Sequence, residues 1–387
     1  MNSTLATLPA ALAGLTVIII VLWDAFEAII LPRRVTRRIR LTRLFYRATW
    51  QPCSALLRRL PPGKKREKYL SFYGPLSLLL LLLVWAVGLV AGFATLLWAL
   101  AVRLNVPAET TAFGTYLYMS GVTFFTLGFG DITPATSLGR TLTVIEAGVG
   151  FGFLAIVIGY LPVLYQAFSR REVNISLLDA RAGSPSSAIE LLRRHGESDS
   201  LDDLTNLLRE WERWSSELLE SHLSYPLLCY YRSQHDNQSW LASLTTIMDT
   251  CALIIAGVDG VRAWQAQLTF AMARHAIVDI AQIFNSAPVA PDRDRLTPED
   301  TIRARKTLAS VGVVLHDDDA AAQKLSELRQ MYEPYVNALS CHLLMTLPPW
   351  VPATEGADNW RTSAWGRISA GLEVSPQSQA RDDEHVW

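Results

Sequence analysis

The run from Tyr69 to Val102 contains 34 consecutive residues without a charged side chain. A helix of that length would extend about 51 Å, which exceeds the roughly 30 Å hydrocarbon core of a bilayer. We therefore expect a membrane helix that tilts or projects into the interface. Residues 8–31 and 141–169 are two further apolar segments long enough to cross a bilayer. The sequence predicts an all-α membrane protein with three transmembrane helices.

Charge is unevenly distributed along the chain and indicates its orientation. Residues 1–172 contain 17 Lys and Arg against seven Asp and Glu, a net charge of +10, whereas the remainder carries −11. Thirteen of those basic residues lie in residues 32–69, so the positive-inside rule makes this connection cytoplasmic. We expect a multi-pass protein of the cell membrane with its N-terminus outside and its acidic C-terminal half in the cytoplasm. No charged side chain precedes the first apolar segment, which favours a retained helix over a signal peptide.

The basic connection mixes its arginines with large apolar residues, as in the stretch from Ile39 to Trp50. This pattern is typical of an amphipathic helix lying on a membrane surface. Two interpretations remain open: the segment Arg33–Lys68 binds anionic lipids, or its charges only fix the topology. Nucleic-acid binding is not expected, because these charges are tied to the membrane.

A short stretch between the second and third spans carries the strongest functional signal. Residues 112–125 are apolar but too short to cross, so they predict a short helix that re-enters the membrane from outside, with Thr110 or Thr111 to cap its start. Its C-terminal end would direct a partial negative charge towards the membrane centre, which favours a cation. Gly128 and Gly130 follow at alternate positions and permit backbone angles that turn successive carbonyls to one side.

The string Thr126-Leu-Gly-Phe-Gly-Asp131 resembles the selectivity filter of the tetrameric potassium-channel family. The resemblance continues through Pro134 and Gly139-Arg140 and covers roughly residues 72–168. It implies that four chains form a homotetramer around one filter, with K⁺ as the permeant ion and no other cofactor. It also implies a role for each position: K⁺ binding by the carbonyls of Thr126, Leu127, Gly128 and Phe129 and by the Thr126 hydroxyl, completion of the filter by Gly130, and bracing of its outer mouth by Asp131.

Two positions depart from the family pattern. Phe129 replaces the commoner tyrosine, and Phe125 replaces a threonine often found below the filter. Potassium selectivity is expected to persist because the series of carbonyls is intact. The alternatives are a nonselective cation channel and a membrane-tethered sensor or scaffold with a non-conducting pore.

The other membrane positions of interest lie in the first and third spans. Glu146 is expected to pack behind the pore helix and support the filter, or else only to satisfy a polar neighbour. Gly150 falls at the family's hinge position, with Gly159 and Pro162 as further points of bending. Asp24 and Glu27 share one face of the first helix. They are expected to pair with Arg33, Arg34 or another helix, or else to take part in gating or proton sensing. The first helix lacks regularly spaced arginines, so no voltage sensor is expected.

The C-terminal half predicts an all-α cytoplasmic domain. Apolar residues recur at helical spacing in six segments: 188–195, 202–221, 240–258, 263–285, 298–315 and 320–347. Residues 240–258 are apolar enough for a fourth crossing, but Asp249 within them favours a buried helix of a bundle. The expected domains are a membrane helix (1–31), a basic linker (32–69), a pore domain (70–170), a helical cytoplasmic domain (171–350) and a flexible tail (351–387).

No ligand of this domain is identified by the sequence. Asp317–Asp319 favours a helix cap over a calcium site, and His275 with Asp279 shares a helical face without further metal ligands. Residues 221–240 are dense in aromatic and polar side chains, which suits a helix junction, a pocket or a subunit interface. The four cysteines are far apart and are expected to be reduced thiols. No nucleophile and base signature indicates an enzyme.

Overall fold

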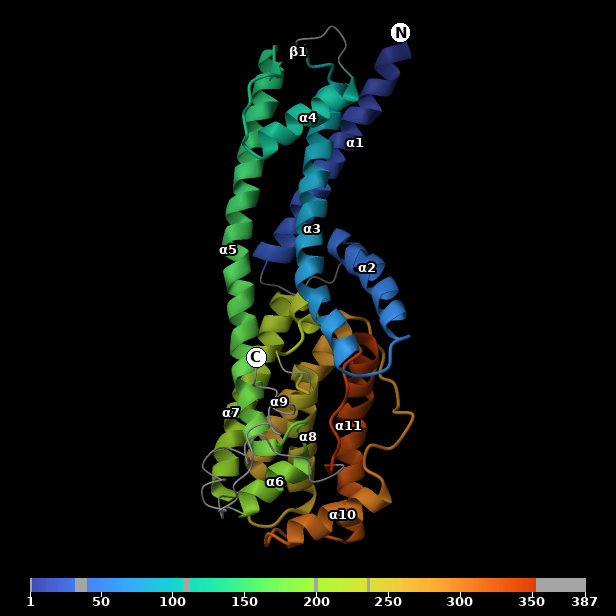
Figure 1. Cartoon of the computed structure of the whole chain (residues 1–387), viewed down its shortest axis with the longest axis vertical. Helices are drawn as coiled ribbons and strands as arrows, with labels where there is room; N and C mark the ends of the chain where they lie inside the picture. Colours follow the sequence, from blue (N-terminus) through green and yellow to red (C-terminus); the bar gives the residue numbers. More distant parts are fainter. Residues whose placement is uncertain (1, 32–39, 107–111, 198–200, 235–236, 353–387) are drawn as a thin grey trace, which may run out of the picture. The chain divides into compact units, whose positions relative to one another are not determined.

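The computed structural model describes residues 2–31, 40–106, 112–197, 201–234 and 237–352 (Figure 1). Residues 33, 34, 110 and 111 and the predicted tail beyond 352 lie outside these ranges. The chain forms two compact units. The membrane unit comprises Met1–Arg59 and Phe72–Gln166, and the bundle unit comprises Leu60–Ser71 and Ala167–Trp387.

Long helices account for most of the membrane unit. They are α1 (Asn2–Ala25), which continues as a π-helical turn (Phe26–Ile30), α2 (Leu41–Leu57), α3 (Lys64–Ala99), α4 (Phe113–Phe124) and α5 (Ser137–Ala182). Two short antiparallel strands, β1 (Leu104–Asn105) and β2 (Thr133–Pro134), pair Leu104 with Pro134. Pro162 lies inside α5 without ending it. The predicted spans are present, and both α3 and α5 extend beyond their apolar segments into the bundle unit.

A small apolar core fixes the short helix α4 near the C-terminal end of α3 and the N-terminal end of α5 (Figure 1). It contains Ala94 and Leu97 of α3, Val102, and Tyr116 and Met119 of α4. The Tyr116 hydroxyl donates a hydrogen bond of 2.8 Å to the carbonyl oxygen of Val102, so its polar end is satisfied within this core. The N-cap residue of α4 is Ala112, which makes no side-chain cap, and the expected caps Thr110 and Thr111 lie outside the described residues.

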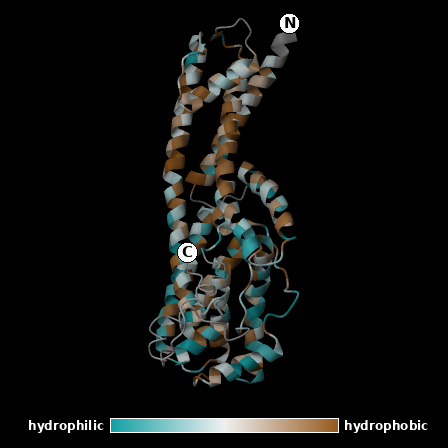
Figure 2. Cartoon of the chain, viewed as in Figure 1, coloured by the Kyte–Doolittle hydropathy of each residue, from teal (hydrophilic) through white to brown (hydrophobic). Residues whose placement is uncertain are grey.

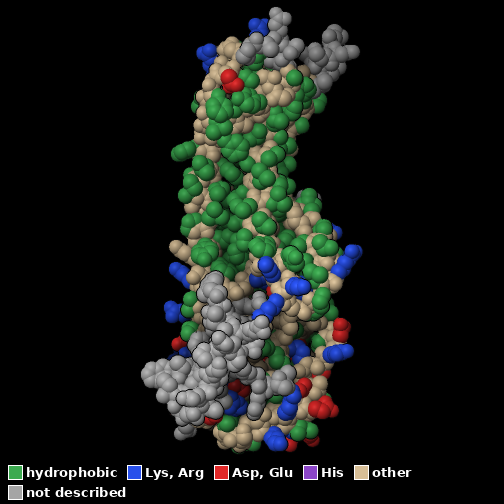
Figure 3. All heavy atoms as spheres, viewed as in Figure 1, with side chains coloured by type: hydrophobic (Ala, Val, Ile, Leu, Met, Phe, Trp, Pro, Cys, Tyr) green, Lys and Arg blue, Asp and Glu red, His purple; other side chains and the backbone are tan. Residues whose placement is uncertain are grey.

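Among the residues that the structure describes, four helices are long and apolar enough to span a membrane: Thr7–Ile30, Lys64–Ala99, Ser137–Ala182 and Trp240–Gly257. Hydrophobic residues predominate along the long helices of the membrane unit (Figure 2), and hydrophobic side chains cover much of the face shown in Figure 3. In α5 only 11% of the most apolar window is buried within the chain, against 83% in α8 (Trp240–Gly257). The apolar character of α8 is therefore explained by protein packing, whereas α5 needs lipid or further chains to cover it.

The bundle unit consists of further helices joined by short connections. These are α6 (Ala188–Glu197), α7 (Leu201–Ser224), a 3₁₀ turn η2 (Pro226–Tyr230), α8, α9 (Ala263–Ile283), α10 (Pro298–Ala309) and α11 (Asp319–Leu343). α8 and α9 pack against each other, α7 packs on α9, and α11 packs on both α8 and α9. The predicted helices are all present.

Two of the predicted helix ends were placed too far along the chain. Residues 298–315 were expected to be helical, but α10 ends at Ala309 because the chain turns at Gly312, whose φ is 77°. Residues 320–347 were expected to form one helix, but α11 ends at Leu343 because Leu344 takes the left-handed conformation. Asp318 caps α11 by accepting a hydrogen bond of 2.7 Å from the backbone N–H of Ala321.

The charge within α8 is compensated inside the bundle. Asp249 is fully buried, and its Oδ2 lies 2.6 Å from Nη2 of Arg295. The Tyr332 hydroxyl also donates to Asp249, and Arg295 forms a second ion pair of 3.3 Å with Glu333. A buried carboxylate is tolerated only when it is paired and hydrogen-bonded, and this one is both.

Candidate ion pathway

The predicted filter string, residues 126–131, begins directly after the end of α4. The backbone N–H groups of Phe125, Thr126 and Leu127 donate to the carbonyls of Gly121, Thr123 and Val122 at 2.9–3.0 Å. The chain therefore turns out of the helix with these three donors facing back towards α4. The carbonyl end of a helix carries a partial negative charge, so this turn places the string at a site that favours cations.

Positive φ angles occur at every second residue between 126 and 130. Thr126 has a φ of 56°, Gly128 of 60° and Gly130 of 77°. Glycine adopts such angles at little cost, whereas threonine rarely does so, and Thr126 is held there by the hydrogen bonds of its neighbours. A φ that changes sign from one residue to the next rotates successive peptide groups relative to each other. A run of carbonyls that face one side requires this local geometry.

The carbonyls of residues 126–130 accept no hydrogen bond from the part of the chain that the structure describes. Leu127 and Phe129 are also exposed, at 57% and 66%. Backbone carbonyls in folded proteins are almost always hydrogen-bonded or hydrated. These oxygens are therefore available to water or to a cation.

Asp131, which directly follows residues 126–130, is hydrogen-bonded to α4. The Tyr118 hydroxyl, on α4, donates a hydrogen bond of 2.9 Å to Oδ2 of Asp131. The bracing role of Asp131 stays a prediction, and this contact is consistent with it. Sequence reasoning did not identify Tyr118, although each of the two phenols in this short helix is a signal that a polar partner is needed.

Glu146, predicted to pack behind the pore helix, is fully buried between α4 and neighbouring elements. Its Oε1 is hydrogen-bonded to Oγ of Ser120, in the middle of α4. The same Ser120 Oγ lies 2.8 Å from the carbonyl oxygen of Val90 in α3. One serine thus joins α4 to both α3 and α5, and Ser120 was not identified from the sequence.

The predicted hinge residues occupy different environments. A Cβ atom on Gly150 would lie 1.9 Å from the carbonyl oxygen of Phe124, so α5 contacts the end of α4 at a point where only glycine fits. A Cβ on Gly159 would meet nothing within 4 Å in this chain. Pro162 continues the helix. Gly150 therefore has a packing role, whether or not it is also a hinge.

The two carboxylates of the first helix contact the amphipathic helix α2. Asp24 accepts hydrogen bonds from the backbone N–H of Thr42 at 3.0 Å, from its hydroxyl, and from Nε1 of Trp85 at 3.0 Å. Because Thr42 lies in the first turn of α2, whose own N-cap residue makes no side-chain cap, Asp24 serves as a cap from another helix. Glu27 accepts from Trp23 at 2.7 Å and pairs with Arg40 at 3.3 Å. The pairing partners Arg33 and Arg34 lie outside the described residues.

In the bundle unit, the dense segment 221–240 surrounds Arg171 near the C-terminal end of α5. The Arg171 guanidinium donates to the carbonyls of Leu228 and Tyr231 at 2.9 and 3.0 Å, and lies 3.4 Å from Nε2 of His222. Since an arginine can only donate, Nε2 of His222 is an acceptor, and its Nδ1–H donates to the carbonyl of Leu218 at 2.8 Å. The described part of this segment forms a helix junction whose groups pack around the Arg171 guanidinium.

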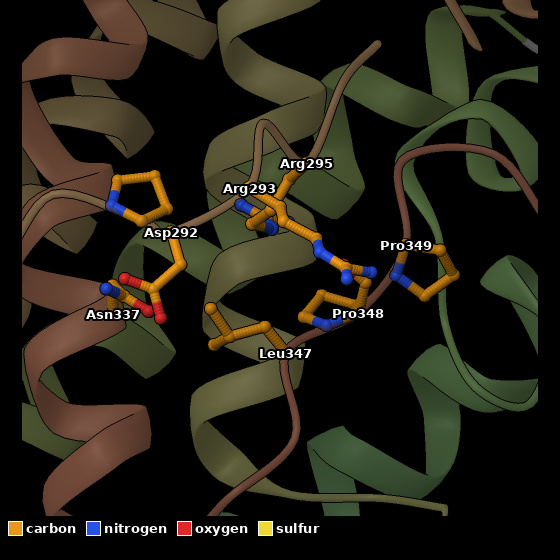
Figure 4. A pocket seen from close by; sticks show the side chains of 8 residues that line it. Asp292, Arg293, Arg295, Asn337, Leu347, Pro348 and Pro349 are labelled. Atoms are coloured by element: carbon orange, nitrogen blue, oxygen red, sulfur yellow. The ribbon is translucent and has the colours of Figure 1, made fainter.

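A surface pocket of about 520 Å³ lies on the bundle unit (Figure 4). Its lining consists of Pro291, Asp292, Arg293, Arg295, Asn337, Leu347, Pro348 and Pro349. The Arg295 guanidinium is already engaged by Asp249, Glu333 and the carbonyl of Pro348. None of the eight lining residues is a Ser, Thr, Cys, Lys or His.

The candidate metal positions remain pairs at most. Nε2 of His275 and Oδ2 of Asp279 lie 3.9 Å apart on one exposed face. Within the described residues no group of three or more His, Cys, Asp or Glu side chains is placed to hold a metal ion. The four cysteines are free thiols.

Comparison with known proteins assigns a class to the membrane unit. A protein family described as "Ion channel" matches residues 79–166, which run from α3 through the filter string to α5. The uncharacterized membrane protein YdjJ of Bacillus subtilis is 21% identical over 294 residues, covering 75% of this chain and 83% of that protein. The probable potassium channel protein 2 of Methanocaldococcus jannaschii is 50% identical over 46 residues, 12% of this chain and 13% of that protein. No solved structure gives a significant match. The chain is an all-α membrane protein that contains an ion-channel domain.

Proposed function

We propose that this chain is one subunit of a potassium-selective channel, in which four copies assemble around a common axis and K⁺ flows passively down its electrochemical gradient. The observation that carries the proposal is the backbone of residues 126–130, with alternate positive φ angles and carbonyls that accept no hydrogen bond from the described residues. Four such strings would surround a dehydrated cation with carbonyl oxygens that replace its hydration shell.

Assembly follows from what one chain leaves uncovered. Each chain supplies a single filter string, whose Leu127 and Phe129 side chains are exposed, and α5 is largely uncovered. Irregular backbone at membrane depth is tolerated only where protein or water covers it. Neighbouring copies would provide that cover and close the pathway.

The proposed topology has the N-terminus outside and the bundle unit in the cytoplasm. α2, which is amphipathic and belongs to the basic connection, would lie on the inner leaflet, where the arginines of residues 33–68 meet anionic lipid. Bending of α5 at Gly150, Gly159 or Pro162 would open a cytoplasmic gate, which the bundle unit biases through the end of α5 at Arg171. Deletion from Asn174 onward would leave the currents unchanged if this coupling does not exist.

The decisive experiment is a reversal potential. The purified full chain, reconstituted in planar bilayers between opposed K⁺ and Na⁺ solutions, is expected to reverse near the K⁺ equilibrium potential. A reversal near zero with clear current would instead support a nonselective cation channel, which Phe125 and Phe129 would then explain. Absence of current from a correctly assembled protein would favour a membrane-tethered sensor or scaffold.

A matched pair of glycine variants links the current to the filter. Gly128→Ala places a side chain at a φ of 60°, which costs roughly 1–2 kcal/mol for an L-residue, and is expected to abolish selective conduction. Gly114→Ala, in the first turn of α4, adds a Cβ that meets nothing within 4 Å in this chain and is expected to conduct normally. Equal currents from both variants would contradict conduction through this string.

A further inference from the structure

Ser120 makes two hydrogen bonds that compete for a single proton. Its Oγ contacts both the carbonyl oxygen of Val90, at 2.8 Å, and Oε1 of Glu146. A backbone carbonyl can only accept, and a serine hydroxyl has one proton to give. If that proton is given to Glu146, the Ser120 and Val90 oxygens face each other without a proton between them. Both contacts are satisfied only if Ser120 donates to Val90 and the second proton comes from Glu146.

The surroundings of the Glu146 carboxyl group also favour a proton on it. Glu146 is fully buried within the chain, so solvent does not reach it. Its other oxygen, Oε2, has no hydrogen-bond partner among the described residues. An ionised carboxylate with one bare oxygen in the interior of a membrane protein is strongly disfavoured, whereas the carbonyl oxygen of a neutral acid costs far less to leave unpaired.

We infer that Glu146 is a protonated, uncharged positioning residue whose hydroxyl donates to Ser120, which in turn donates to the carbonyl of Val90. The resulting chain of hydrogen bonds runs from α5 through α4 to α3 with one fixed direction. It holds the pore helix at mid-length between the two long helices. Its role in positioning a filter rests on the proposed function, but the protonation state does not.

Infrared difference spectroscopy of the full chain at neutral pH tests the protonation state directly. A protonated carboxyl has a C=O stretch at higher frequency than both the amide band and the bands of a carboxylate. The spectrum of the wild type minus that of Glu146→Gln is expected to show this carboxylic acid band. A difference spectrum with carboxylate bands in its place overturns the inference.

Two further variants test the positioning role. Glu146→Gln keeps a donor towards Ser120 and is expected to retain the unfolding temperature of the wild type and its ion selectivity. Glu146→Ala removes the donor and is expected to lower the unfolding temperature by several degrees. Equal losses in both variants would show that side-chain volume matters rather than the donated hydrogen bond, and would overturn the positioning role.

Ser120→Ala provides an internal control for the direction of the chain. It removes the acceptor of the Glu146 hydroxyl, so the carboxylic acid band is expected to persist but to shift in frequency. A band that does not move would contradict the donation to Ser120. If the band behaves as expected while no variant, nor the wild type, conducts, the inference about Glu146 stands and the proposed channel function fails.

Discussion

Nε1 of Trp85 in α3 donates a hydrogen bond of 3.0 Å to Oδ2 of Asp24 in α1, and the same carboxylate accepts from the first turn of α2. Three helices of the membrane unit thus converge on one side chain. The cap that α2 lacks in its own sequence is supplied from another helix, which fixes where the amphipathic helix begins.

Asp24→Ala is expected to destabilise the membrane unit. Loss of a helix cap costs about 0.5–2 kcal/mol, and the indole N–H of Trp85 would be left buried without a partner. The measurement is the unfolding temperature of the detergent-solubilised full chain. Glu217→Ala serves as the control because Glu217 is 57% exposed and only pairs with a neighbour on its own helix. Equal unfolding temperatures for the two variants would contradict the capping role.

Gly150→Ala separates the packing role of this glycine from a hinge role. The added Cβ would lie 1.9 Å from the carbonyl oxygen of Phe124, so α5 and the end of α4 must separate, at a cost of about 1–3 kcal/mol. We expect a lower unfolding temperature and altered selectivity, while Gly159→Ala, with open space around it, is neutral in stability. A stable Gly150→Ala variant whose open probability alone changes would indicate a hinge without a packing role.

Tyr118→Phe is expected to shorten the time for which the conducting filter persists. The change removes the hydroxyl that donates to Asp131 and leaves the ring in place. Currents during sustained activity should therefore decline faster, by a fewfold, at unchanged reversal potential. Tyr69→Phe is the control because Tyr69 is 58% exposed at the start of α3. Identical time courses would show that the Tyr118 contact does not support the filter.

Arg295→Met is expected to destabilise the bundle unit severely. Removing one partner of a buried ion pair costs about 3–5 kcal/mol, because Asp249 would be left charged in the interior of the bundle. Arg293→Met, on the same pocket and exposed, should change stability little. Chemical denaturation of the full chain followed by tryptophan fluorescence measures both, since Trp350 lies beside the Arg295 guanidinium. Comparable midpoints for the two variants would argue against an ionised Asp249.

His222 is expected to make the stability of the bundle unit depend on pH. The pKa of His222 lies well below its usual range because burial disfavours the charged ring and because Arg171 repels it. The unfolded chain therefore binds a proton near pH 6.5 that the folded chain does not. Stability should fall as the pH drops below about 6.5, by up to about 1.4 kcal/mol per pH unit for this one group.

The slope is measured from the unfolding midpoints of the full chain at a series of pH values between about 7.5 and about 5, spaced by roughly half a pH unit. His222→Gln is expected to flatten it, whatever its effect on stability at neutral pH. An unaltered slope in His222→Gln would show that this histidine does not titrate on unfolding.

Local sequence patterns predicted the helices well, because apolar length and periodicity depend on neighbouring residues. They made α10 and α11 too long, because the apolar pattern continues past the true helix ends. Gly312 and Leu344, which have positive φ angles, turn the chain away after these helices. The segment 126–131 was identified from its motif. Asp131 and Glu146 were also expected beside it, whereas their partners Tyr118 and Ser120 were not identified, because these contacts join residues separated in the sequence that no local pattern encodes.

The exposed apolar surface of α5 bears on how a defect in one subunit would affect the whole proposed assembly. One pathway is shared by four subunits, so a single Gly128→Ala chain among four would be enough to distort it. Co-production of wild-type and altered chains would then lose far more current than the fraction of altered chains, and the defect would behave as dominant. Because each chain would rely on its neighbours to cover the surface of α5, a defect in one chain would also impair its neighbours.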